Sequence, residues 1–316
     1  MARRCEREAK SGFTRQICSL AKRLIGIRDE GNKSLYKGMA QRRLIGSMVR
    51  GYREQAAFDL DDAAKFIGCD RSKMSRIETG ERGLASSELR KLLTEYYVTT
   101  RQQDLLAALS GWREMPGWFA GFLSDLPSPY LDFVSMETFA SKCLIYAPTQ
   151  IPEPLCIEPY ISALVAAAPS IPKDKEAQVV QATQARRRAV VGERRTGLFV
   201  VLGEAALRRQ VGDAEVLRRQ LAYLIELTGH DYSWINIRVL PFDAEPTAVG
   251  DGGAFAILRF EEIPDLSIMQ LAGPAGGLCL YDQELATRYV KAFPSLTLHS
   301  LSATQSARRI ALMASR

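Results

Sequence analysis

The sequence lacks a hydrophobic run long enough to cross a bilayer, for which roughly 18 consecutive apolar residues are needed. Its first residues also lack the sustained apolar stretch and the small-residue cleavage site of a secretory signal. These two absences argue against an integral membrane protein and against a secreted one. We therefore expect a cytoplasmic protein that makes no membrane contact.

Histidine and closely spaced cysteine are also scarce. His230 and His299 are the only histidines and lie far apart in the sequence, which disfavours catalysis by an imidazole base. The six cysteines include no Cys-x-x-Cys pair, so their spacing suits neither a zinc site nor a disulfide framework. They are Cys5, Cys18, Cys69, Cys143, Cys156 and Cys279. The pattern predicts free thiols in a reducing compartment, no metal site and no cofactor.

The net charge of +6 is unevenly distributed. Residues 1–43 hold twelve Lys and Arg against four Asp and Glu, a local charge of +8. Residues 44–110 hold ten of each sign, and residues 111–316 carry −2. Because the basic excess lies wholly in the first 43 residues, the overall charge alone does not identify a nucleic-acid partner for the rest of the chain.

The chain of 316 residues, 47% hydrophobic and 25% charged, has the composition of a globular protein and exceeds the usual size of one domain. A Ser-Gly pair at 110–111 and a Met-Pro-Gly turn at 115–117 mark a change in residue pattern. We predict a basic extension over 1–43, a first domain over 44–110 and a second domain over 112–316.

The extension has few large apolar side chains and many Lys and Arg, so we expect it to be flexible. One interpretation is a basic arm that adds salt-sensitive attraction to DNA. The other is that the natural chain starts near Met39, because Met39–Arg43 would make a normal start for the domain that follows. The sequence leaves both interpretations open.

The first domain contains a pair of short helices joined by a tight turn. The segment 58–67 has a capping aspartate followed by an apolar face, and a Gly-Cys turn follows it. Ala64 provides the small side chain that two helices crossing at a steep angle require. Asp70 then caps a second helix, which Gly80 ends.

The second helix has two different faces. Met74 and Ile77 lie three residues apart, so both can anchor the helix in a small core. The other face carries a set of hydrogen-bond donors for phosphates and base edges: Arg71, Ser72, Lys73, Ser75 and Arg76. Arginine suits base reading because its planar fork can bond both major-groove acceptors of guanine. The sequence therefore predicts a helix that enters the major groove of double-stranded DNA.

Residues 44–110 resemble the phage-repressor-like helix-turn-helix domains of the xenobiotic-response-element type. The stretch 72–80, Ser-Lys-Met-Ser-Arg-Ile-Glu-Thr-Gly, carries the resemblance. It implies an all-α bundle of five helices in which Arg71, Ser72 and Arg76 face bases or phosphates. For Lys73 and Ser75, a contact with DNA and simple solvation both remain open.

The resemblance also implies that Glu78 is structural and pairs with Arg53 of the first helix. The sequence departs from the family pattern at the start of the second helix, where Thr-Gln is common and Asp59-Leu60 stands instead. Together with Asp61 and Asp62, this change removes a polar anchor for the DNA backbone and adds repulsion towards phosphates.

The second domain starts with a proline-rich segment and continues with helices expected at 160–168, 175–195 and 211–228. Four short stretches rich in β-branched and aromatic residues are typical of strands. They are Leu198–Leu202, Trp234–Leu240, Ala254–Phe260 and Leu266–Leu271. Helices followed by several closely spaced strands predict an α+β domain with a mostly antiparallel sheet.

This second domain resembles a regulatory domain of unknown function that accompanies such helix-turn-helix domains in many actinobacterial regulators. The stretches 146–152, 204–209 and 237–242 carry the resemblance. It implies a partner, because members are often encoded beside a very small modulating protein. One departure is Gly203, where the family usually has an acidic residue.

Other interpretations of this domain remain open. Glu204, Asp243 and Asp251 could form a hydrolytic carboxylate pair, but their spacing does not demand one, and we expect no enzyme. Four aromatic residues fit either a ligand pocket or the core: Trp234, Phe242, Phe255 and Tyr281. The Arg run at 186–188 fits either a nucleic-acid patch or a solvated helix face.

Taken together, these features predict a sequence-specific transcriptional regulator associated with the nucleoid, whose second domain senses a ligand or a small protein. We expect a homodimer on a dyad-symmetric operator, because one recognition helix covers only a few base pairs. The alternative is an interaction protein that a partner sequesters in a toxin–antitoxin-like pair, with DNA binding secondary.

Overall fold

The structure is a computed structural model, and it is described by residue ranges. The described residues are 39–111, 128–137, 139–169, 171–193, 196–245, 253–261, 263–273 and 277–315. Most of the predicted basic extension and the segment around the predicted domain boundary therefore lie outside the described residues.

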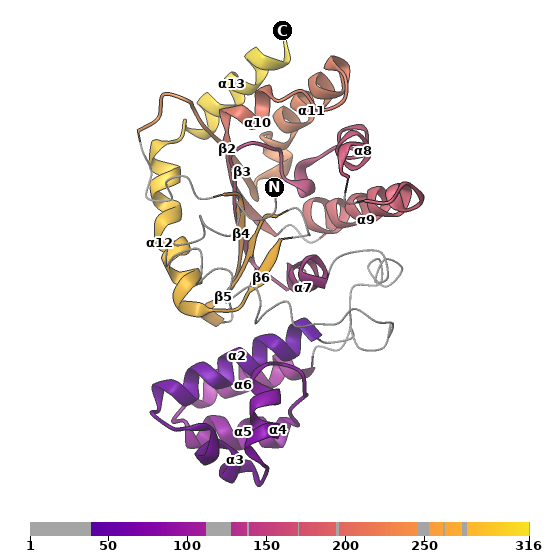
Figure 1. Cartoon of the computed structure of the whole chain (residues 1–316). Helices are drawn as coiled ribbons and strands as arrows, with labels where there is room; N and C mark the ends of the chain where they lie inside the picture. The colour runs from indigo at the N-terminus through magenta and orange to yellow at the C-terminus, as the bar shows by residue number, and fades with distance from the viewer. Residues whose placement is uncertain are drawn as a thin grey trace, which may run out of the picture. The chain divides into compact units, whose positions relative to one another are not determined.

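The N-terminal region is helical. Its helices are α2 (Met39–Gln55), α3 (Leu60–Ile67), α4 (Arg71–Glu78), α5 (Ser86–Glu95) and α6 (Thr100–Gly111) (Figure 1). Their apolar faces meet in a core that includes Leu44, Val49, Met74, Leu89 and Leu92, all fully buried. Helix α2 begins at Met39, so five residues that we assigned to the extension form its first turn.

The C-terminal region alternates helices and strands. Its elements are α7 (Ser128–Glu137), β1 (Lys142–Ala147), η2 (Glu153–Leu155), α8 (Glu158–Ala167), η3 (Lys173–Lys175), α9 (Glu176–Arg187), the π-helical η4 (Arg188–Glu193), β2 (Gly197–Gly203), α10 (Glu204–Arg208), α11 (Ala214–Leu227), η5 (His230–Tyr232), β3 (Ile235–Leu240), β4 (Phe255–Phe260), β5 (Ile263–Leu271), β6 (Leu278–Leu280), α12 (Gln283–His299) and α13 (Ala303–Ala314).

The strands form one mixed sheet in the order β3-β2-β1-β4-β5-β6. Strands β1, β2 and β3 run parallel, and β4, β5 and β6 pair antiparallel. Our prediction of a mostly antiparallel sheet was wrong in its parallel half. One cause is that we did not interpret the predicted helix at 211–228, between the predicted strands 198–202 and 234–240, as the crossover of a parallel pair. The other is β1, which we did not identify as a strand. Without β1, the helices before β2 cannot be recognised as the crossover connection that a parallel pair requires.

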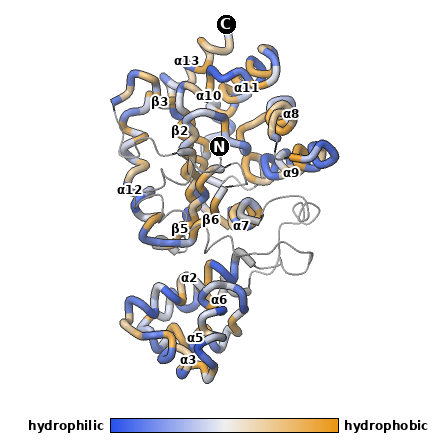
Figure 2. Tube along the Cα trace, in the orientation of Figure 1, coloured by the Kyte–Doolittle hydropathy of each residue, from blue (hydrophilic) through white to orange (hydrophobic). Residues whose placement is uncertain are grey.

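Helices cover both faces of this sheet. Every second residue of β1, β2 and β3 packs on α8, α9 and α11. On the opposite face, Tyr146, Val201 and Phe255 pack against Phe293 and Leu296 of α12. Figure 1 shows α12 on one side of the sheet and α8, α9 and α11 on the other. In Figure 2 the strands between these two helix layers are predominantly hydrophobic, as a sheet buried on both faces requires.

Candidate nucleic-acid interface

Side-chain caps fix the starts of α3 and α4, and a glycine ends α3 at the turn between them. The Asp59 carboxylate accepts from the Asp62 N–H at 2.8 Å, and the Asp62 carboxylate accepts from the Asp59 N–H at 3.4 Å. Gly68 ends α3 with φ +67°, a left-handed conformation that glycine adopts without strain. The Asp70 carboxylate then accepts from the Lys73 N–H at 2.6 Å and starts α4. Asp59 and Asp62 thus form a capping box at the start of α3.

Helix α4 is held in place by its inner face. Met74 and Ile77 are buried, and the small Ala64 of α3 is buried beneath them. Gly46 of α2 has no space for a side chain, because a Cβ there would overlap the backbone oxygen of Ile77. This glycine lets α2 approach the end of α4 closely, a requirement that we did not infer from the sequence.

The end of α4 is also tied to α2 by charge. Arg53 donates from Nε to Oε1 of Glu78 at 2.7 Å and from Nη2 to Oε2 at 3.0 Å. Its Nη1 donates to the backbone oxygen of Phe58 at 2.8 Å. The pair is the one that the family resemblance implies, and it lies behind the helix rather than on its outer face.

The outer face of α4 presents four of the five proposed DNA-contacting residues. Arg71, Ser72, Ser75 and Arg76 are exposed on it. Lys73 differs, because its ammonium lies 3.0 Å from Glu88 of α5 and its side chain is only 21% exposed. Glu88 also accepts from the Ala85 N–H at 3.1 Å, so Lys73 contributes to holding α5 beside α4.

One acidic residue of α3, Asp61, lies beside the outer face of α4. Asp61 accepts from Nη1 of Arg71 at 2.7 Å, and both side chains are about half exposed or more. Asp62 instead pairs with Lys65 at 3.5 Å. The acidic start of α3 therefore offsets part of the positive charge on the outer face of α4 through the pair of Asp61 with Arg71.

Arg82 is a further basic residue that we did not identify from the sequence. It is exposed, and its N–H donates to the Arg76 oxygen at 2.9 Å, which folds the segment after α4 back against that helix. The pKa of Glu88 is lowered chiefly by the Ala85 N–H and by Lys73, and the positive charge of Arg82 adds to this effect. Arg82 therefore contributes positive charge beside the outer face of α4.

Comparison with known families agrees with this geometry. Residues 44–109 match the family described as a helix-turn-helix domain. Residues 130–311 match the family described as a domain of unknown function (DUF5753). The chain belongs to the DUF5753 family. Its helix-turn-helix domain indicates a DNA-binding regulator. No curated protein and no solved structure matches the chain.

Two of the three suggested carboxylates of the DUF5753 domain lie in the described residues, and they differ in burial. Glu204 is buried and engaged by Arg208 and Arg309, whereas Asp243 is exposed. Asp251 lies outside the described residues. Among the described residues there is also no group of three or more His, Cys, Asp or Glu placed to hold a metal ion.

The four aromatic residues considered for either a ligand pocket or the core do not form one cluster. Phe255 lies in the cluster with Tyr146 and Phe293, while Trp234 and Tyr281 border the opposite, larger core. Phe242 is 68% exposed.

No helix in the described part of the chain is long and apolar enough to span a membrane.

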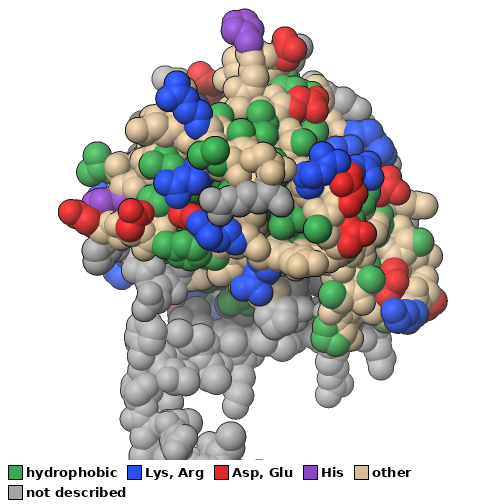
Figure 3. Space-filling model, turned by 90° about the horizontal axis from the view of Figure 1, so that it is seen from above, with side chains coloured by type: hydrophobic (Ala, Val, Ile, Leu, Met, Phe, Trp, Pro, Cys, Tyr) green, Lys and Arg blue, Asp and Glu red, His purple; other side chains and the backbone are tan. Residues whose placement is uncertain are grey.

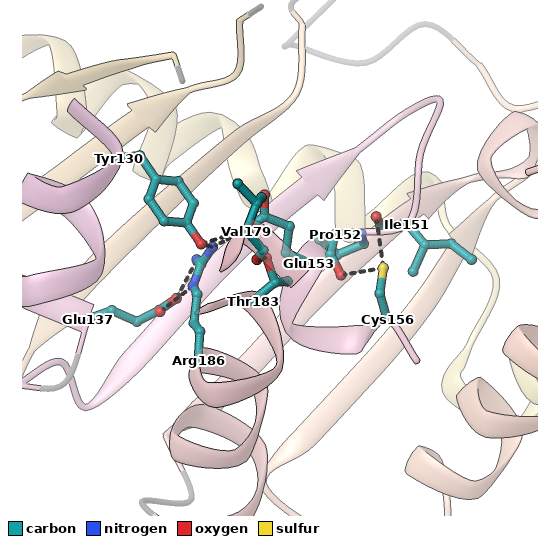
Figure 4. A network of polar contacts seen from close by, with 9 residues as sticks. All are labelled: Tyr130, Glu137, Ile151, Pro152, Glu153, Cys156, Val179, Thr183 and Arg186. Carbon is teal, nitrogen blue, oxygen red and sulfur yellow. Dashed lines mark hydrogen bonds and ion pairs between the residues drawn. The ribbon is translucent and has the colours of Figure 1, made fainter. Parts of the chain in front are cut away.

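Within the arginine run at 186–188, Arg186 fits neither of our interpretations, whereas Arg188 is exposed, as on a solvated helix face. Arg186 is buried and forms a two-point pair with Glu137 at 2.7 and 2.8 Å (Figure 4). Its Nη1 also donates to Glu153 at 2.8 Å, and the Tyr130 hydroxyl donates to the same carboxylate at 2.8 Å. The Arg187 guanidinium lies 5.3 Å from the Tyr223 ring centre. Arg186 and Arg187 therefore make contacts within the domain instead of forming a surface patch.

Proposed function

We propose that the protein is a sequence-specific transcriptional regulator of the xenobiotic-response-element type that binds double-stranded DNA in the nucleoid. The observation that supports this most strongly is α4, which presents Arg71, Ser72, Ser75 and Arg76 outward while Met74 and Ile77 are buried. Exposed donors on a helix that is anchored from behind are what reading of major-groove base edges requires.

The proposed regulator binds as a homodimer on a dyad-symmetric operator. The reason is the length of α4, whose eight residues span only a few base pairs of one major groove. Two such helices related by a two-fold axis contact half-sites about 34–36 Å apart, one helical turn of DNA.

The DUF5753 domain is proposed as a non-enzymatic controller that senses a ligand or a small protein, as in the actinobacterial regulators that it resembles. The charged clusters around Arg186 and Glu204 consist of ion pairs within the domain, which suits a structural and binding role better than hydrolysis. The sequestration alternative differs in one respect: a bound partner would abolish DNA occupancy at every site.

Genomic footprinting of the full-length protein tests DNA reading directly. Arg71→Ala/Arg76→Ala should remove occupancy at dyad-symmetric sites, because removal of a base-reading side chain costs about 1–3 kcal/mol of discrimination. Arg218→Ala/Arg288→Ala is the matched control, since it removes the same charge from two exposed, ion-paired arginines of the DUF5753 domain. Unchanged occupancy in the Arg71/Arg76 variant would refute the recognition-helix proposal.

A further inference from the structure

The carboxyl ends of the three parallel strands meet at one edge of the sheet. Ala147 pairs with Leu202, and Gly203 pairs with Leu240, so the segments after β1, β2 and β3 lie side by side. A Cβ on residue 203 would overlap the Pro148 backbone, which shows how closely the first two segments approach. In sheets with parallel strands and covering helices, this edge is where ligands characteristically bind.

A buried carboxylate organises two arginines at this edge. Glu204 is 4% exposed and accepts from Arg208 at 2.5 Å and from Arg309 of α13 at 3.1 Å. It also accepts from the Phe242 N–H at 3.3 Å. Burial alone would raise the pKa of Glu204, but the bonds to Arg208 and Phe242 and the charge of Arg309 lower it overall. The carboxylate is therefore charged and fixes both guanidinium groups.

These guanidinium groups keep unused donors towards solvent. Each arginine has five N–H donors, of which Glu204 accepts two from Arg208 and one from Arg309. Their side chains remain 53% and 36% exposed. One carboxylate between two arginines leaves a positive charge, and Arg209, bonded to the neutral Thr149 oxygen at 3.2 Å, adds another. The exposed Asp243, which follows Phe242, offsets one of these two charges.

An exposed aromatic ring completes the arrangement. Phe242 follows β3 and is 68% exposed, and the Arg208 guanidinium lies 5.7 Å from its ring centre. Figure 3 views the molecule from above, the side on which Figure 1 places α10 and α13, and shows Lys and Arg side chains next to hydrophobic ones on this surface. A flat apolar surface beside fixed donors can hold a planar group that carries an anion.

We propose that this edge, formed by Arg208, Arg309 and Phe242, binds a small molecule that joins a phosphate or carboxylate group to an aromatic ring. Planar guanidinium forks match both oxyanions, and the ring stacks against Phe242. The inference names a ligand class for the sensing role of the DUF5753 domain, so it rests on that part of the proposed function. It does not depend on DNA reading by α4.

Calorimetric titration of the full-length protein with phenyl phosphate, benzoate and inorganic phosphate tests the site and separates the two anions. We expect saturable binding of phenyl phosphate or benzoate, tighter than that of phosphate alone. Arg309→Gln should lower the affinity for the aromatic anion about tenfold through loss of a charged donor, while Arg208 still pairs with Glu204. Phe242→Ala should lower the affinity for the aromatic anion without changing the affinity for inorganic phosphate.

The matched control is Arg218→Gln, which removes an exposed arginine on α11 that is paired with Glu215. Absence of saturable binding by both aromatic anions, or equal weakening by Arg218→Gln and Arg309→Gln, would overturn the proposal. Phe242→Ala affects an exposed side chain and keeps the test valid if Arg309→Gln fails to fold. The titration contains no DNA, so anion binding can be observed even if footprinting refutes the DNA-reading proposal. Likewise, footprinting can support DNA reading even if the titration shows no anion binding.

Discussion

Arg53 and Glu78 form a bidentate ion pair behind α4, with N–O distances of 2.7 and 3.0 Å and side chains only 10% and 6% exposed. The hydrogen bonds to Glu78 raise the pKa of Arg53, so the guanidinium is fully charged. The pair joins the end of α2 to the end of α4. The orientation of the outer face of α4 therefore depends on a contact that does not touch DNA.

The first prediction concerns this pair. Glu78→Gln should destabilise the helical domain by about 3–5 kcal/mol, because it leaves Arg53 buried beside a neutral partner. Hydrogen exchange of the α4 amides in the full-length protein measures the effect. Asp104→Asn is the control, because Asp104 is 60% exposed and pairs with Arg90 at the surface. Equal exchange in both variants would show that the buried pair does not hold α4.

The second prediction concerns the competition of Asp61 with DNA for Arg71. Asp61→Asn should strengthen operator binding by about two- to fivefold, the range for loss of one exposed ion pair. Removal of a negative charge near phosphates acts in the same direction. Asp104→Asn, which frees Arg90 from a similar exposed pair at 2.9 Å, is the control and should leave affinity unchanged. Gel-shift titration of both variants measures the difference, and weaker binding by Asp61→Asn would contradict the argument.

How far the sequence predicts this region depends on the range of the interactions. The caps of α3 and α4 and the buried Met74 and Ile77 follow from patterns within about ten residues, and these could be inferred directly. The pairing of Lys73 with Glu88 joins two helices, and the close approach at Gly46 joins residues roughly 30 positions apart along the chain. Helical periodicity, which describes one helix at a time, carries no information about such contacts between elements.

In the DUF5753 domain, contacts between distant segments limited prediction from the sequence even more. Strands β2, β3, β4 and β5 were recognisable as β-branched and aromatic runs. Strand β1 was not, because its first residue is an exposed lysine and a proline follows its end, so the run resembles the loop beyond it. Burial of Arg186 was also hidden, since its partners Glu137 and Glu153 lie on segments that the fold alone brings together.

The third prediction distinguishes Lys73 from Arg76. Arg76→Met should reduce both operator affinity and the slope of log affinity against log salt, by about 0.9 for each phosphate that the side chain no longer neutralises. Lys73→Met should reduce the slope less, because the ammonium is already 3.0 Å from Glu88. Titrations at several salt concentrations measure both slopes. A larger reduction of the slope for Lys73→Met would show that this lysine leaves Glu88 to reach a phosphate.

The fourth prediction is a pH dependence at the start of α5. The Ala85 N–H and Lys73 lower the pKa of Glu88 in the folded protein. The stability that they contribute is therefore present above the ordinary glutamate pKa of about 4.3, and it is lost as pH falls through the lowered value. Glu88→Gln should be less stable at neutral pH and should lose less stability on acidification. Melting curves between neutral and acidic pH measure both differences, and parallel curves for both proteins would contradict the assignment.

The last prediction concerns the buried network of Arg186, which connects α7, α9 and the segment before α8 (Figure 4). Arg186→Met should destabilise the DUF5753 domain by about 3–5 kcal/mol, because Glu137, 1% exposed, loses the partner that compensates for its burial. The double variant Arg186→Met/Glu137→Leu should recover part of this loss, since no unpaired buried carboxyl group is left. Glu153→Gln should cost less, because that side chain is 39% exposed. Thermal unfolding of the three proteins orders these effects; a double variant less stable than Arg186→Met would show that Glu137 has a further role within the network.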